Sequence, residues 1–358
     1  MTTAHVEFAE LHDELTAVAR DLLASAPREV NVDWSLIIRS GWTGLEVPET
    51  LGGAGATFAE VAVILREIGR AAARGPYPAV TGIAVGALGL LEPSARRDDL
   101  LAATASGDRA PVVAMAGEGL FANSFRLIDT THGPALSGAA DFVLDGPGAD
   151  RLLIPAVGGD GVAVIVDLGA HTTGLHVEGQ PVVDKTRSLG RVAGDDVLVS
   201  PDSVLRFNPD PEHSLQRLYD RAAVTVALDS LGLSEAMLDA TVAYVGVREQ
   251  FGRKIGSFQA VKHACADMLV QITIARTLVA AAVKALTDPD AEAGVAAAMA
   301  KSFTTAMAVD IAGKAMQLHG GMGYTWESGI HVYFKRATLN RSLFGSPAAH
   351  RKRLAMRY

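Results

Sequence analysis

The sequence predicts an α+β protein in three parts: an N-terminal all-helical domain over residues 1–108, a middle β domain over 109–208, and a C-terminal helical bundle over 209–358. Three observations support this. The length of 358 residues exceeds that of a usual single domain. Helical periodicity fills both ends of the chain, and between them the sequence breaks into short Val, Ile and Leu runs separated by Gly, Asp and Pro.

The first 108 residues contain several apolar repeats at spacings of three and four, which is typical of amphipathic helices. One helix begins with a clear cap, because Thr57 precedes the apolar run and Glu60 follows three residues later. The loop before it is rich in glycine and lacks the lysine of a phosphate-binding loop. Helices are expected at Val6–Leu23, around Trp34–Ile38, and at Phe58–Ala73, Ala79–Leu91 and Pro93–Ser106.

The middle segment predicts a compact β domain of barrel or sandwich type. Its apolar runs are short and rich in Val, Ile and Leu, and turn residues separate them. No helix of crossover length lies between them, which argues against a parallel α/β sheet. Strands are expected in the runs 111–117, 151–156, 161–169, 174–179 and 195–205.

After the linker at Pro209 and Pro211, helical periodicity returns and continues to the end of the chain. Long helices joined by short loops form antiparallel bundles, in which each buries an apolar stripe. A four-helix bundle is therefore expected, with helices at about 213–247, 257–286, 291–318 and 328–341, followed by a last helix from Ala348.

Composition excludes several classes of function. The formal charge of -8 disfavours nucleic-acid binding, since the basic residues crowd only at Arg351, Lys352 and Arg353, which fit a solvated helix face. The single cysteine, Cys265, excludes an intrachain disulfide and a cysteine-based zinc site. No metal site is predicted.

The sequence shows no sign of export or membrane insertion. The first 30 residues carry Glu7, Glu10, Asp13 and Glu14 among their acidic side chains and no continuous apolar core, unlike a signal peptide. No run reaches the roughly 20 apolar residues that span a bilayer. A cytoplasmic protein is expected.

Four motifs carry a resemblance to a known family. They are GLEVPETLGGAG (44–55), VLVSPDSVL (197–205), REQFGRKIGSFQAVKH (248–263) and QLHGGMGY (317–324). Together with the order of the three domains, they resemble the acyl-CoA dehydrogenases, which are FAD-dependent flavoproteins. The resemblance implies an acyl-CoA substrate, assembly as a dimer or tetramer with itself or with a second acyl-CoA dehydrogenase subunit, and electron-transfer flavoprotein as the electron acceptor.

The resemblance also implies which residues contact FAD. Arg248 would hold the pyrophosphate of FAD in a neighbouring subunit through a two-pronged hydrogen bond. Without the motif, a surface ion pair would be the simpler interpretation. Gly320 and Gly321 would let the backbone approach the cofactor, and a helix C-cap is compatible with this role. The remaining contacts would come from Phe251, Phe258, Gln259, Gln317 and Leu318.

The catalytic base of the family is missing from its usual position. The reaction removes an α-proton from the thioester, which requires a carboxylate. Phe344 stands where most members carry a glutamate, and Ala222 or Ala223 stands where others place theirs on the first bundle helix. Asp220 and Asp229 lie nearby and are weak alternative bases, for which capping or ion-pair roles are favoured.

Segments that cover the flavin in the family also differ here. The loop after the first β-domain strand reads AMAGEGLFANSFR (114–126), and Phe142 or Val143 stands where a tryptophan is expected. The favoured hypothesis is therefore a base-deficient subunit of an α2β2 enzyme, which acts on a steroid side-chain or other bulky acyl-CoA and contributes to the partner's FAD site. The alternatives are a self-sufficient homo-oligomer that uses a relocated aspartate, and a non-catalytic, FAD-free binding or regulatory paralogue.

Overall fold

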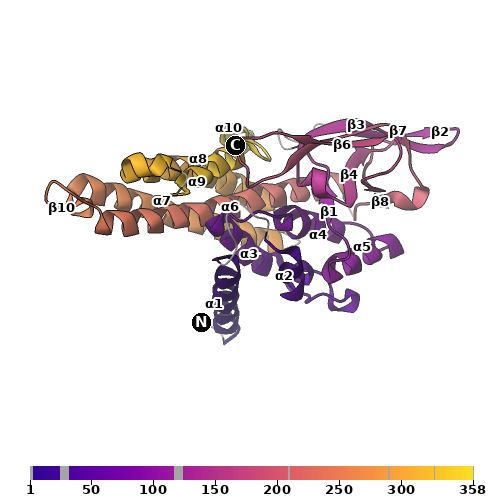
Figure 1. Ribbon diagram of the computed structural model, residues 1–358. Coiled ribbons are helices and arrows are strands. Elements are labelled where there is room, and N and C mark those ends of the chain that lie inside the picture. The colour runs from indigo at the N-terminus through magenta and orange to yellow at the C-terminus, as the bar shows by residue number, and fades with distance from the viewer. Residues whose placement is uncertain are drawn as a thin grey trace.

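The computed structural model describes residues 3–24, 32–116, 124–208, 210–288, 291–325 and 327–357. The predicted α+β architecture is confirmed: along the sequence, a β domain lies between an N-terminal and a C-terminal helical part (Figure 1). Part of the linker at Pro209 and of the loop 114–126 lies outside the described residues. So does Trp326.

The N-terminal helices pack against the start of the bundle. The predicted cap of α3 is present, because the Thr57 N–H donates to the Glu60 carboxylate over 2.8 Å and the Thr57 hydroxyl accepts from the Ala59 N–H. The elements are α1 (Thr3–Ala24), α2 (Trp34–Arg39), η1 (Trp42–Gly44), η2 (Glu49–Leu51), α3 (Phe58–Ala71), η3 (Pro78–Ala84), α4 (Val85–Gly89) and α5 (Ala95–Ser106).

The segment η3 is a π-helix rather than the regular α-helix expected from 79 to 91. Widened turns leave carbonyls that other groups must satisfy. Arg221 of the bundle does this, since its Nε donates to the Gly82 carbonyl over 2.7 Å while its Nη1 donates to Glu46 over 2.8 Å. This arginine therefore ties two parts of the N-terminal domain to the bundle.

The β domain is an eight-stranded sheet in two halves, and its path runs β6-β7-β3-β2-β4-β5-β8, with β1 beside β4. The halves meet through one parallel pair, Arg126 with Val157, which gives a sandwich-like arrangement. The strands are β1 (Pro111–Val113), β2 (Phe125–Thr130), β3 (Gly133–Leu144), β4 (Arg151–Val157), β5 (Ala163–Gly169), β6 (Leu175–Gln180), β7 (Leu189–Leu198) and β8 (Val204–Arg206), with the short helices η4 (Gly146–Gly148) and η5 (Pro201–Ser203).

The C-terminal bundle is elongated, with the β domain at one end and the β9–β10 hairpin at the other (Figure 1). Its longest helix, α6, packs on both α3 and α8. The elements are α6 (Pro211–Val247), β9 (Glu249–Gln250), β10 (Arg253–Lys254), η6 (Ile255–Ser257), α7 (Gln259–Thr287), α8 (Ala293–His319), η7 (Gly320–Tyr324), α9 (Ile330–Ser342) and α10 (Pro347–Ala355).

Two helical segments correct the expectation that no run is long and apolar enough to span a bilayer. Gln259–Thr287 and Ala293–Tyr324 both pass by length and composition. The apolar window of the second is 61% buried, as expected of a bundle core helix, whereas that of the first is only 22% buried. In this single chain α7 therefore leaves an apolar surface uncovered, with Val270 and Ile274 on it.

Candidate functional site at the end of the bundle

The first FAD motif forms the tip of the bundle. Arg248 caps the end of α6, and its side chain is exposed and makes no ion pair with any described residue. The simpler interpretation as a surface ion pair therefore finds no support in the structure. Two short strands follow and place Phe251 at the turn with φ of 54° and 91% of its surface exposed. An exposed aromatic in the left-handed region is typical of a recognition element.

Two aromatic contacts brace this hairpin. The Phe251 and Phe258 rings meet edge to face with centroids 6.1 Å apart. The guanidinium of Arg253 lies 3.9 Å from the centroid of the Phe258 ring. Arg253 was not among the predicted contacts, since a stacking arginine has no signature of its own in a basic stretch. Gln259 begins α7 directly beside this cluster, with its side chain exposed.

The second FAD motif lies where α8 ends. Gln317 and Leu318 occupy the last turn, with Gln317 exposed and Leu318 half-buried. Gly320 is the helix C-cap, at φ 59° and ψ -138°, a conformation that essentially only glycine adopts. A Cβ added at Gly320 or Gly321 would meet no atom within 4 Å, so this backbone borders open space. The capping role is confirmed, and the backbone remains accessible to a ligand.

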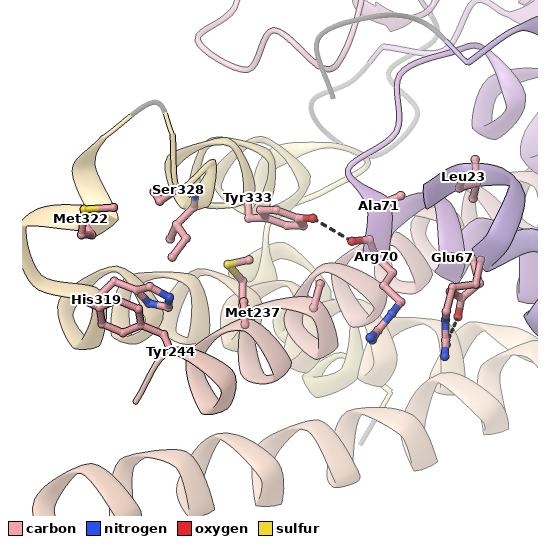
Figure 2. A pocket seen from close by; sticks show the side chains of 14 residues that line it. Leu23, Glu67, Arg70, Ala71, Met237, Tyr244, His319, Met322, Ser328 and Tyr333 are labelled. Atoms are coloured by element: carbon pink, nitrogen blue, oxygen red, sulfur yellow. Dashed lines mark hydrogen bonds and ion pairs between the residues drawn. The ribbon is translucent and has the colours of Figure 1, made fainter. Parts of the chain in front are cut away.

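The structure brings the two motifs to the same end of the bundle. Tyr244, one turn before Arg248, stacks on His319, which precedes Gly320 (Figure 2). A guanidinium without an ion pair among the described residues, an exposed aromatic and open glycine backbone form a donor set that fits a diphosphate carrying ring systems. These residues therefore fit the FAD contacts that the sequence implies, although they form only one wall.

The stacked rings of Tyr244 and His319 line one end of a pocket of about 540 Å³, which lies between the bundle and the N-terminal helices (Figure 2). Its floor is apolar and includes Met237. At the other end Arg20 and Glu67 form an ion pair of 2.9 Å, and the Tyr333 hydroxyl donates to the Arg70 carbonyl over 3.0 Å. The polar groups of this end are thus occupied by one another.

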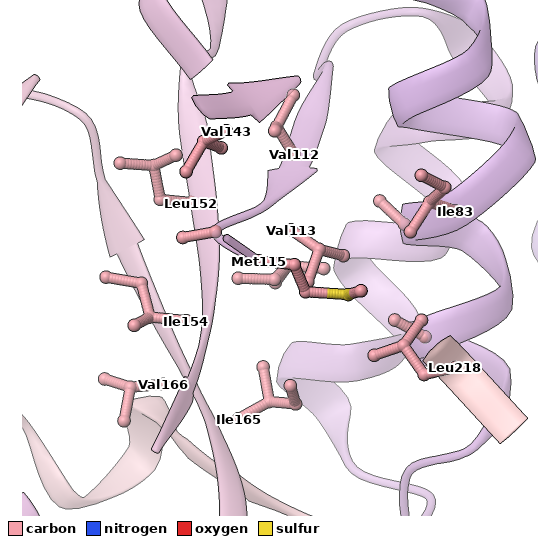
Figure 3. Packing of buried hydrophobic residues seen from close by; sticks show 14 of the residues in the cluster. Ile83, Val112, Val113, Met115, Val143, Leu152, Ile154, Ile165, Val166 and Leu218 are labelled. Atoms are coloured by element: carbon pink, nitrogen blue, oxygen red, sulfur yellow. The ribbon is translucent and has the colours of Figure 1, made fainter. Parts of the chain in front are cut away.

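The position of the usual base lies in packed core. Phe344 is 2% exposed and belongs to a large apolar cluster, part of which, around Ile83, Val113 and Met115, is drawn in Figure 3. The space beside its ring has no room for a water molecule, and the walls come from both the N-terminal and β domains: Ala79, Ile83, Val112, Val113, Met115 and Leu144. A flavin ring or thioester does not fit beside Phe344 in this chain.

Three buried donors fix the backbone at this position. The Tyr219 hydroxyl donates to the Phe344 carbonyl over 2.6 Å, and Lys301 Nζ donates to the Gly345 carbonyl over 2.7 Å. His350 Nε2 lies 2.9 Å from the Phe344 carbonyl, so this nitrogen carries the proton. Burial lowers the pKa of Lys301 to about 7 and that of His350 to about 4. The loop is therefore held rigidly, with Phe344 at φ 52°.

Both alternative bases are ion-paired. Asp220 is buried and bound by both terminal nitrogens of Arg353. Burial raises the pKa of Asp220, and Arg353 opposes that shift. Because Asp220 is buried and paired with Arg353, its carboxylate does not face a cavity that could hold a substrate.

Asp229 is more deeply engaged. Arg336 Nε lies 2.8 and 2.9 Å from its two oxygens, and Arg187 Nη2 lies 2.5 Å away. Burial by itself raises the pKa of Asp229, but Arg336 and Arg187 outweigh it and the net pKa is lowered. The geometry agrees with the favoured ion-pair roles of both aspartates.

The two residues at the expected tryptophan position lie at a break in β3. Register shifts occur between Ala140 and Val143, where Phe142 has φ 56° and Val143 is fully buried. The Phe142 N–H donates to Gln180 Oε1 over 2.6 Å. Within the described part of the chain, no group of three or more His, Cys, Asp or Glu side chains could hold a metal ion.

Comparison with known proteins places this architecture in one class. An N-terminal helical domain, a β domain and a C-terminal helical bundle together form the architecture of a flavoprotein dehydrogenase. The family model described as "Acyl-CoA dehydrogenase, C-terminal domain" matches residues 214–358, and "Acyl-CoA dehydrogenase, N-terminal domain" matches 5–108. The chain belongs to the acyl-CoA dehydrogenase family, which consists of FAD-dependent oxidoreductases.

Relatives and solved structures support the assignment. Acyl-CoA dehydrogenase IpdE2 of Mycobacterium tuberculosis is 33% identical over 324 residues, which cover 90% of this chain and 85% of that protein. A variant of the Tcur3481-Tcur3483 steroid ACAD has a TM-score of 0.86 at 28% identity and covers 97% of both chains. The ChsE4-ChsE5 complex from Mycobacterium tuberculosis has a TM-score of 0.84 at 25% identity, covering 99% of this chain and 97% of that one.

Proposed function

We propose that this chain is the base-deficient subunit of a two-subunit acyl-CoA dehydrogenase. Its partner supplies the catalytic carboxylate and the cleft for the flavin ring, and this chain completes the FAD site from across the interface. The observation that carries the proposal is Phe344, which fills the position of the base inside packed core. Asp220 and Asp229 do not replace it, because arginines occupy both.

The contacts at the bundle end support a contribution to a neighbour's cofactor. Bound FAD would accept the hydride from the β-carbon of the acyl group. This chain's own part is to bind and orient: Arg248 and the Gly320–Gly321 backbone face outward, and Phe251 projects from the hairpin. The space beside Phe344 is packed, and arginines bind Asp220 and Asp229, so this chain moves no proton at the thioester.

The partner and substrate are suggested by the same comparison. Two structural relatives are named as a steroid ACAD and as a complex of two different chains, which favours a heteromer acting on a steroid side-chain or other bulky acyl-CoA. The apolar surface of α7 gives a further reason for assembly. We assign electron-transfer flavoprotein as the acceptor and the cytoplasm as the compartment.

The test is turnover with and without the partner. The chain is tagged in its own host and purified with whatever subunit accompanies it, and acyl-CoA oxidation is measured with an artificial electron acceptor. Turnover is expected only in the complex, and Asp220→Asn or Asp229→Asn in this chain should alter it only as far as they alter folding. Turnover by the chain alone that disappears in one of these variants would favour the self-sufficient alternative.

A further inference from the structure

Two aromatic rings join the ends of α6 and α8. The Tyr244 and His319 rings lie with centroids 4.4 Å apart and planes inclined by 20° (Figure 2). His319 Nδ1 lies 2.8 Å from the Ala315 carbonyl, so this nitrogen carries a proton and the bond fixes the ring against its own helix. His319 is buried, at 7% exposure, and Tyr244 is half-buried.

Each ring is directly connected to one FAD-contacting segment. The Tyr244 carbonyl accepts the Arg248 N–H over 2.9 Å, which sets where the guanidinium leaves the helix. His319 immediately precedes Gly320, and the turn η7 lies close against α8, since a Cβ on Gly323 would come 2.5 Å from the Met316 carbonyl. A change in the stack would therefore shift Arg248 relative to the glycine backbone.

The stack is needed because neither segment continues its α-helix. Beyond Val247 and beyond His319 the chain leaves α-helical geometry, for a hairpin in one case and a short 3-10 helix in the other, so α-helix packing alone does not fix the backbone of the hairpin or of η7. A two-pronged guanidinium contact requires the partner groups to be held within roughly 0.5 Å. A near-parallel ring pair supplies such a constraint in addition to the apolar area that it buries.

We infer that Tyr244 and His319 are positioning residues, which hold Arg248 and the Gly320–Gly321 backbone in register for FAD bound by the partner subunit. The inference rests on the proposed function. It assigns no contact with FAD to either ring. Their effect passes through the residues next to them in the chain.

The first test measures the affinity of the native complex for FAD. After removal of FAD, rebinding is monitored by flavin fluorescence for the Tyr244→Leu and His319→Leu variants, with Arg248→Met as the positive control. Each Leu variant should weaken FAD binding about tenfold, which is the largest effect expected from the loss of one ring pair. Tyr244→Phe, which keeps the ring, and Met237→Leu, which alters the same pocket away from the stack, should stay within about twofold.

The double variant distinguishes one shared contact between the two rings from two independent structural effects. Tyr244→Leu combined with His319→Leu should weaken FAD binding no further than either change alone, because both remove the same contact. Additive losses would overturn the inference. Leu variants that lower the melting temperature of the complex but leave its FAD affinity unchanged would also overturn it.

A second measurement uses the isolated chain and needs no partner. Tyr244→Leu should speed amide hydrogen exchange about tenfold in both segments, 249–257 and 320–325, whereas Met237→Leu should not. Unchanged exchange at either segment contradicts the positioning role. If Arg248→Met loses FAD and Tyr244→Leu does not, the positioning role of the stack is contradicted and the proposed function stands. If the Arg248→Met complex keeps its FAD affinity, the proposed function itself is contradicted.

Discussion

At the level of single residues, the proposal rests on Phe344, whose loop is fixed by buried polar side chains. Buried Tyr219, Lys301 and His350 fix the carbonyls of Phe344 and Gly345. Polar side chains are costly to bury, and here each has a backbone partner. The loop is thus held in one conformation, as the loop of a catalytic residue would need to be, but its side chain at this position is apolar and buried.

The Phe344→Ala variant should be less stable than the parent by about 3 to 5 kcal/mol, since it removes a buried ring and leaves a cavity. Urea denaturation of the isolated chain measures the difference. The control is Phe344→Leu, which fills most of the space and should cost clearly less. A loss under about 1 kcal/mol for the alanine variant would show that the position is open rather than packed.

Asp145 provides a second prediction at this scale. Burial raises its pKa to about 7, although Arg187 and Arg336 act to lower it. Because the unfolded pKa is about 3.9, the native state binds the extra proton between roughly pH 4 and 7, so stability falls as the pH rises through that window.

The Asp145→Asn variant should lose that part of the pH dependence and be more stable than the parent at about pH 8, where the parent's carboxyl is ionised. Asparagine also tolerates the φ of 55° at this position. Urea denaturation at a series of pH values tests this. Parallel profiles for parent and variant would contradict it.

At the scale of elements, the strongly periodic helices could be predicted, and the strands with weak β propensity could not. The capping box at Thr57 identified the start of α3. The strands β2 and β3 were missed, since β3 contains Gly, Ala and Ser and relies on pairing with β7 and β2 rather than on β propensity. The π-helix η3 also has no local signal, because Arg221 stabilises it from another domain.

Helix α7 carries the prediction at this scale. Val270 is 59% exposed and Ile274 is 44% exposed in the single chain, an arrangement expected of an interface helix. The double substitution Val270→Glu and Ile274→Glu should prevent the chain from assembling with other subunits. The resulting monomer should keep an unchanged circular dichroism spectrum. Val183→Glu, on the β domain and 74% exposed, is the control. Light scattering measures the molar mass of each variant, and an intact assembly in the double variant would contradict the prediction.

For the whole molecule, motifs in sequence located the candidate FAD contacts but not their arrangement. Arg248 and Gly320 are 72 residues apart, and only the return of α8 alongside α6 shows that they share one end of the bundle. The hypothesis of a missing base could be drawn from Phe344 alone. That its position is closed by walls from two other domains could not, since Ile83, Val113 and Leu144 meet it only after folding.

The flavin content of the purified protein tests the central claim most directly. The claim is that this chain contributes to FAD binding only together with a partner. The isolated, folded chain should show no flavin absorbance, and the complex purified from its host should be yellow, with FAD lost on Arg248→Met substitution in this chain. Stoichiometric FAD in the isolated chain, together with acyl-CoA turnover, would contradict the account.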